Sequence, residues 1–166
     1  MITMKTWLSD ADITYAQYAE KIKQIHQYLH NKIHPYSGWV DWPCRMPEAL
    51  MKEIAETAEE IRHKCTALVV VGVGGSYLGA KSCLELLQSP FYNEYYAEKT
   101  GRPRIYFAGH HVSSTYYAAL LKRLADEEVC LCVISKSGTT LEPTVVFEFL
   151  KDYMIKRYGK GEAVQR

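Results

Sequence analysis

Hydrophobic and polar residues follow two periods along the chain, and their order predicts a fold of alternating strands and helices. Short, mostly apolar runs, typical of buried parallel strands, occupy residues 68–71, 104–108 and 128–134. Each run precedes a segment with apolar residues at helical spacing, over residues 76–88, 114–125 and 140–158. This order predicts an α/β protein: a doubly wound parallel sheet of three strands with helices on both faces.

Two more helical patterns precede the first strand, at residues 10–34 and 46–64. In the second pattern the apolar positions expected to be buried are Leu50, Ile54, Ala58 and Ile61. Trp39 and Trp42 lie between the two helices and are expected to pack against the domain as a strap. We therefore divide the chain into an N-terminal helical segment with its strap, residues 1–64, and a sheet domain, residues 65–166.

The connecting segments contain few regular patterns. Residues 91–102 are polar apart from three tyrosines and a phenylalanine, and they predict an irregular connection. The hydroxyl residues Ser113, Ser114 and Thr115 are candidate caps for the helix that follows them. A polar segment, residues 159–166, follows the last helical pattern.

Composition and charge narrow the class of protein. The 166 residues are 48% hydrophobic and have a formal net charge of +1, which suits one globular domain and gives no attraction to nucleic acid or a membrane surface. No apolar run approaches the ~18 residues of a membrane span, and no signal peptide is visible, so we expect a cytoplasmic protein. The five cysteines lack C-x-x-C spacing and are expected to be reduced core thiols.

The first candidate site is the junction between the first strand and its helix, where Gly72, Gly74, Gly75 and Ser76 interrupt the apolar pattern. Glycines there allow backbone N–H groups to approach an anion such as phosphate at a helix N-terminus. A dinucleotide fingerprint needs a third glycine where Tyr77 stands, so a nicotinamide cofactor is disfavoured. Relative to a nucleotide P-loop, Lys81 is one residue too late, which turns its side chain by about 100° and disfavours an ATPase.

A second junction of this kind follows the third strand. Four hydroxyl residues, one lysine and one glycine occupy six consecutive positions: Ser135, Lys136, Ser137, Gly138, Thr139 and Thr140. Hydroxyls and turn N–H groups donate to phosphate oxygens, and a lysine supplies positive charge. Each loop alone is also compatible with an ordinary capped turn. Together they favour a shared phosphate site, because parallel strands place their C-terminal ends at one edge of the sheet.

Histidines offer weaker candidates for chemistry. His26, His30 and His34 recur every four residues, a spacing that can bind metal, but no cysteine or carboxylate cluster completes a ligand set, so we expect a polar stripe and no metal. His110 and His111 follow the second strand, and nothing nearby in the sequence orients them as an acid or base.

Two motifs carry a family resemblance. Residues 72–79 and 134–143 resemble the two phosphate-loop motifs of the glucose-6-phosphate isomerase family, within the sugar isomerase domain superfamily, and residues 38–43 and 112–116 resemble its bacterial members. The resemblance implies reversible conversion of glucose 6-phosphate to fructose 6-phosphate without a cofactor. It implies that the phosphate is held by Ser76, Ser135, Ser137 and Thr140. It also implies that the pocket is lined by Gly74, Gly75, Lys136 and Thr139.

The chain departs from the family in length. The family's glutamate base, its histidine and its basic residues follow the second phosphate loop by a long stretch, so we expect no catalytic residue within this chain. Residues 65–166 then represent the first part of a sugar isomerase domain, truncated relative to the family and inactive alone. In the family further strands pair with the third strand, so we expect residues 129–134 to form an unpaired sheet edge that promotes self-association. The resemblance also implies that the full-length protein is a homodimer.

Two alternatives remain from the sequence. One is a regulatory domain that binds a sugar phosphate, and the other is a different sugar-phosphate isomerase of the same superfamily. The second loop and residues 38–43 favour glucose-6-phosphate isomerase over both.

Overall fold

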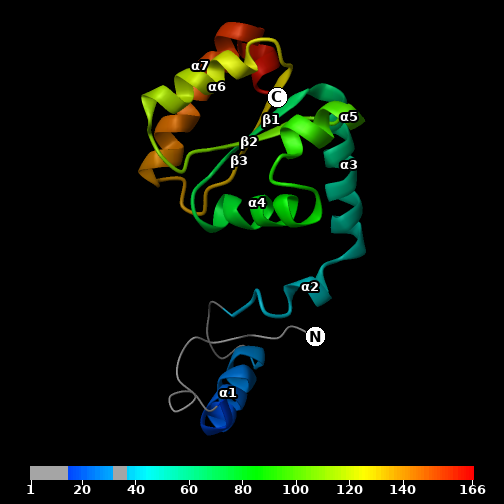
Figure 1. The fold of residues 1–166 in the computed structure, drawn as a ribbon, viewed down its shortest axis with the longest axis vertical. Helices are drawn as coiled ribbons and strands as arrows, with labels where there is room; N and C mark the ends of the chain where they lie inside the picture. The colour runs from blue at the N-terminus through cyan, green and yellow to red at the C-terminus, as the bar shows by residue number, and fades with distance from the viewer. Residues whose placement is uncertain (1–14, 32–36) are drawn as a thin grey trace. The chain divides into compact units, whose positions relative to one another are not determined.

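A computed structural model describes residues 15–31 and 37–166, in two compact units, Met1–Glu53 and Ile54–Arg166 (Figure 1). The helices before the sheet are α1 (Tyr15–His30), α2 (Trp42–Arg45) and α3 (Glu48–Lys64). The strands are β1 (Ala67–Val71), β2 (Arg104–Ala108) and β3 (Val129–Val133). The remaining helices are α4 (Gly75–Leu87), the π-helical η1 (Tyr92–Ala97), α5 (Glu98–Thr100), α6 (Ser114–Leu124) and α7 (Leu141–Ala163). None of the helices in the described part of the chain has the length and apolar character needed to cross a bilayer.

The first unit contains α1, α2 and the beginning of α3. The predicted first helix is confirmed over α1, and the rest of its predicted range falls largely outside the described residues. Nε2 of His30 lies 3.0 Å from Nε2 of His26, whereas His34 is not among the described residues. The described residues contain no group of three possible metal ligands. Trp39 and Trp42 are exposed, and their packing as a strap stays a prediction.

The sheet confirms the predicted doubly wound topology. Its order is β2-β1-β3, and both pairings are parallel. Val69 at the centre of β1 lies opposite Tyr106 of β2 and Leu131 of β3. Since β1 is central, the loops that follow β1 and β3 leave the sheet from neighbouring strands.

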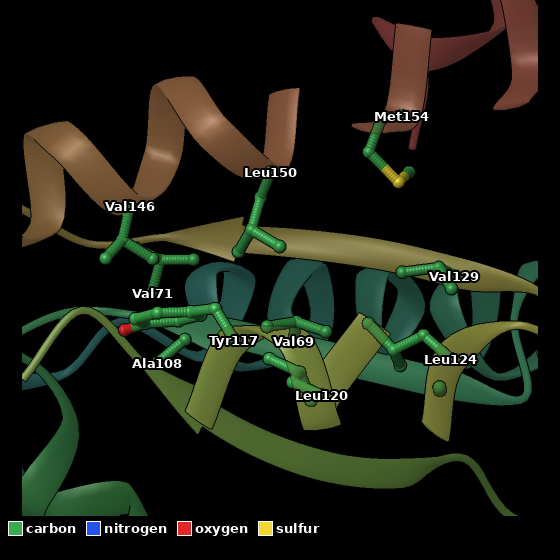
Figure 2. Close-up of a cluster of buried hydrophobic side chains, with 11 residues drawn as sticks. Val69, Val71, Ala108, Tyr117, Leu120, Leu124, Val129, Val146, Leu150 and Met154 are labelled. Carbon is green, nitrogen blue, oxygen red and sulfur yellow. The ribbon is translucent and has the colours of Figure 1, made fainter. Parts of the chain in front are cut away.

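One face of the sheet carries the main hydrophobic core, which α6 and α7 cover (Figure 2). Val69 and Val71 of β1 point toward Leu120 of α6 and Leu150 of α7. All four side chains are at most 6% exposed. This core fixes the two helices that follow β2 and β3.

The opposite face lies against α4 and the end of α3. Leu68 and Val70 line a shallow groove there together with Leu84 of α4. Of the stripe expected to be buried on α3, Ala58 and Ile61 are half-buried, but Ile54 is 50% exposed. The expectation for Ile54 is therefore wrong, whereas Ala58 and Ile61 line a groove beside Leu68 of β1.

Both outer strands have hydrogen bonds along their edges. On β2, the side-chain amide of Asn93 donates to the carbonyl of Ile105 and accepts from its N–H, each at 2.8 Å. On β3, Val129 N–H donates to the Tyr158 hydroxyl at 2.9 Å, and Leu131 N–H donates to the Arg166 carbonyl at 2.7 Å. The expectation of a fully unpaired β3 edge is therefore wrong.

Two further expectations need correction. Residues 92–100 are helical, in η1 and α5. Hydrogen bonds fix this segment against the chain near β2: the Tyr92 hydroxyl donates to the Pro103 carbonyl, and the Asn93 side chain donates to the Ile105 carbonyl. The final helix continues past residue 158 to Ala163 with a kink at Gly159, whose φ is +77°. This continuation brings Arg166 back to β3 and to Glu128, 2.9 Å from its guanidinium.

The cysteines are free, as expected, but not all lie in the core. Cys65 and Cys130 are buried, whereas Cys44 and Cys83 are exposed. Burial raises the pKa of the Cys65 thiol to about 12, so it stays protonated at neutral pH.

Candidate phosphate-binding site

The first loop leaves β1 at Gly72 and enters α4 at Gly75. Gly72 N–H donates to the Ala108 carbonyl of β2 at 2.9 Å, so the loop starts as an extension of the sheet. Gly74, the N-cap of α4, has φ +55° and ψ −128°, a conformation that favours glycine. Ser76 follows in the first helical turn and is half-buried. The loop therefore presents backbone N–H groups and one hydroxyl at a helix N-terminus.

The second loop leaves β3 and enters α7 after Thr140. Its hydroxyl groups organise the turn: Ser135 Oγ accepts from Gly138 N–H at 3.0 Å, and Ser137 Oγ accepts from the Thr139 hydroxyl at 3.0 Å. Gly138 has φ +71°, which explains a glycine at this position. Residues 135–139 are exposed. The turn is thus ordered by its own hydrogen bonds while its side chains face solvent.

The two loops begin in direct contact. Ile134 N–H donates to the Val71 carbonyl at 2.9 Å, which places the start of the second loop beside the first. A Cβ added at Gly72 would lie 3.0 Å from Ser76 Cβ and 3.2 Å from the Ile134 carbonyl oxygen. Any larger residue at this position would make both neighbours shift by a few tenths of an ångström. Ser76 and the residue before Ser135 are therefore close neighbours at the C-terminal edge of the sheet.

Helix N-termini add positive potential at this edge. Both α4 and α7 begin there, and neither has a side-chain cap hydrogen bond. The helix after β2 differs, because Ser113 caps α6 by accepting from Tyr116 N–H at 3.3 Å, as the sequence predicts. Thr140 stands at the equivalent position of α7, and its hydroxyl makes no such bond. Two helix N-termini without side-chain caps, one after a glycine-rich loop and one after a hydroxyl-rich loop, suit an anion.

The lysines near the loops have different surroundings. Lys81 on α4 pairs with Glu85 one turn later and lines a separate cavity of about 290 Å³. This placement agrees with the prediction that Lys81 does not serve as a P-loop lysine. Lys136 is in the second loop and exposed.

An aromatic contact beside the first loop was missed by sequence reasoning. The rings of Tyr77 and His110 are stacked, with centroids 5.1 Å apart and planes 24° from parallel. Tyr77 directly follows Ser76, and His110 follows β2. Both residues stand out in the sequence because each follows a predicted strand. They are 33 positions apart, however, and no local pattern indicates that their rings stack.

Several curated relatives of this chain are named glucose-6-phosphate isomerase. No protein-family model matches the chain. It is 44% identical over 163 residues to a glucose-6-phosphate isomerase of Clostridium perfringens and 40% identical over 163 residues to one of Acetivibrio thermocellus; each match covers 96% of this chain and 36% of the relative. For the glucose-6-phosphate isomerase of Shouchella clausii the identity is 38% over 164 residues, covering 97% of this chain and 36% of the relative.

These matches extend over nearly all of the chain, while the chain spans little more than a third of the length of the curated relatives it matches. The resemblance expected from the two loop motifs is therefore confirmed by similarity along the whole sequence. Over the region that it spans, this chain is related in sequence to the glucose-6-phosphate isomerases.

Proposed function

We propose that this chain forms the phosphate-binding part of a glucose-6-phosphate isomerase, which interconverts glucose 6-phosphate and fructose 6-phosphate. The observation that carries the proposal is the direct contact of a glycine-rich loop and a hydroxyl-rich loop at the start of two helices. The names of the relatives support the substrate class. They favour this function over a regulatory domain.

In this proposal each loop has a defined role. Ser76, Ser135, Ser137 and Thr140 donate hydroxyl hydrogen bonds to the phosphate. Gly74, Gly75, Lys136 and Thr139 line the same pocket. The helix N-termini of α4 and α7 add favourable charge.

Binding the phosphate positions the sugar and does not transfer a proton. A fixed phosphate restricts where C1 and C2 of the open-chain sugar lie, which lowers the entropic cost of the later proton transfer. The groups that move the proton are supplied by the remainder of the whole protein, acting as a homodimer in the cytoplasm. The chain alone then binds sugar phosphate without converting it.

Calorimetric titration with fructose 6-phosphate tests the proposal. We expect binding by the wild-type chain, at least tenfold weaker binding by S137A, and unchanged binding by S82A, whose serine is exposed on α4 outside the loops. Loss of one charge-assisted hydrogen bond of about 1.5–3 kcal/mol corresponds to a change of that size. Equal affinity of S137A and wild type would exclude Ser137 as a phosphate ligand, and a coupled assay that detects turnover would contradict inactivity of the chain.

A further inference from the structure

A cluster of rings surrounds His110 next to the first phosphate loop. Its ring stacks on Tyr77, and its edge contacts involve His111, at a centroid distance of 4.4 Å, and Tyr116, at 6.1 Å. Tyr77 lies in the first turn of α4, directly after Ser76. The Tyr77 ring is therefore attached to the backbone directly after the proposed phosphate ligand.

The turn that carries His110 is held tightly. Gly109 has φ +86°, and a Cβ added to it would lie 2.9 Å from Gly72 N. Gly109 N–H donates to the Tyr117 hydroxyl at 2.9 Å, and that hydroxyl donates to the His111 carbonyl at 2.9 Å. Because Tyr117 is part of the core, the position of His110 is determined by the sheet and α6.

The environment of His110 suits a neutral aromatic ring. Its Nδ1 is buried and has no hydrogen-bond partner among the described residues. Burial, together with electrostatic repulsion from His111 and Lys81, lowers the pKa of His110 below its usual value of 6.5. The facing groups on α4 are Tyr77, Lys81 and Glu85, and Lys81 pairs with Glu85. At neutral pH the imidazole therefore packs as an uncharged ring.

We propose that His110 is a positioning residue for the phosphate site: its stack on Tyr77 holds the first turn of α4, and with it Ser76, in the conformation that receives the phosphate. The inference rests on the proposed function of the loops. It adds a residue outside both loop motifs to the site. His110 acts through Tyr77 and does not itself contact the phosphate.

Replacing the ring separates stacking from other roles. An aromatic contact contributes about 0.5–1.5 kcal/mol, so H110A should weaken binding of inorganic phosphate by about 2- to 12-fold. H110F restores a ring at the same place and should bind within about twofold of wild type. H63A, which removes an exposed histidine on α3, is the matched control and should bind like wild type. H110A that binds as tightly as wild type, or H110F that binds as weakly as H110A, would overturn the proposal.

A second measurement works without ligand and keeps the two proposals distinguishable. Ser76 N–H donates to the Val73 carbonyl and Tyr77 N–H to the Gly74 carbonyl, each at 3.2 Å, so their amide exchange reports on the first turn of α4. We expect faster exchange at both amides in H110A and wild-type exchange in H110F. If wild type fails to bind phosphate but H110A shows this faster exchange, the proposed function fails while the bracing of the turn stands. Unchanged exchange in a folded H110A protein would contradict the bracing.

Discussion

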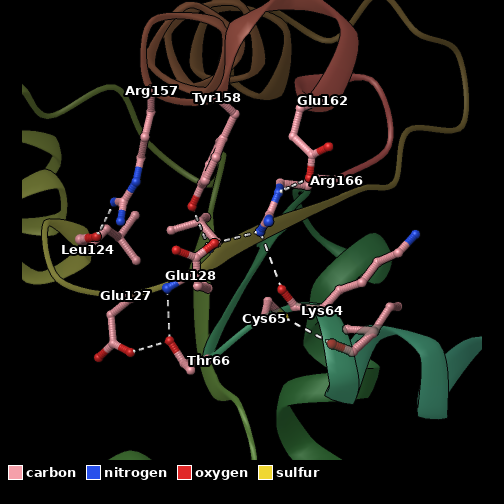
Figure 3. A network of polar contacts seen from close by, with 12 residues as sticks. Lys64, Cys65, Thr66, Leu124, Glu127, Glu128, Arg157, Tyr158, Glu162 and Arg166 are labelled. Atoms are coloured by element: carbon pink, nitrogen blue, oxygen red, sulfur yellow. Dashed lines mark hydrogen bonds and ion pairs between the residues drawn. The ribbon is translucent and has the colours of Figure 1, made fainter.

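Both ends of the sheet carry polar residues, but these residues have different bonding partners at the two ends. At the N-terminal ends of the strands the polar groups bond to one another (Figure 3). Thr66 donates to Glu127 at 2.6 Å and accepts from Glu128 N–H at 2.9 Å, and Arg104 contacts Glu127 at 2.7 Å. At the C-terminal ends, Ser135 and Ser137 bond within an exposed turn.

Burial explains why the polar residues at the two ends of the sheet have different bonding partners. Glu127 is only 9% exposed, so its charge needs partners within the protein, and Arg104 and Thr66 provide them. The second loop lies in solvent, where hydroxyls carry no such requirement and can exchange water for a ligand. The N-terminal end therefore stabilises the fold, and the C-terminal end is where we propose that phosphate binds.

The largest expected effect is on stability, from breaking the buried network. E127A should lower the free energy of unfolding by about 2–4 kcal/mol, because Arg104 then keeps a half-buried charge without its carboxylate. Urea denaturation measures the loss. The control E148A removes one partner of the exposed pair between Glu148 and Lys151 and should cost at most about 0.5 kcal/mol. Similar losses in both variants would show that the Glu127 network has no special role.

G72A should lose less stability than E127A, but it should also lose phosphate binding. The added methyl group meets Ser76 Cβ at 3.0 Å and the Ile134 carbonyl at 3.2 Å, so both loops must shift by a few tenths of an ångström, which we expect to cost about 1–3 kcal/mol. Phosphate binding should fall at least tenfold. G79A is the matched control, since a Cβ at Gly79 has no neighbour within 4 Å and alanine favours a helix by about 1 kcal/mol. Normal phosphate binding by G72A would contradict a site that depends on contact between the loops.

The smallest expected effect is a pH dependence from His110. Its pKa in the folded protein is lower than in the unfolded chain, so the unfolded chain binds more protons once the pH falls below about 6.5. The stability that comes from the neutral His110 ring is complete above that pH. It is lost as the pH falls toward the pKa of His110 in the folded protein. Urea midpoints from pH 7.5 to 5 should therefore fall more steeply for wild type than for H110F. Parallel profiles would show that His110 does not titrate in this way.

Periodicity predicted the strands well because each is a short apolar run with few alternatives. The loop motifs identified the two candidate junctions in the sequence. The parallel sheet, in which β1 and β3 are neighbours, brings these junctions together. What the sequence did not reveal depends on contacts between distant residues. Asn93 on the edge of β2, Arg166 on the edge of β3 and the stack of His110 on Tyr77 each join segments that share no local pattern.

The central claim is that both loops bind one phosphate, and amide NMR of the intact chain tests it most directly. The chain is titrated with fructose 6-phosphate, and inorganic phosphate serves as the control for the sugar. We predict chemical-shift changes at residues 74–76 and at residues 135–140, with the same midpoint, and none at Thr66 or Glu128 at the other end of the sheet. A folded sample in which neither loop responds, or in which only one does, would contradict a shared phosphate site.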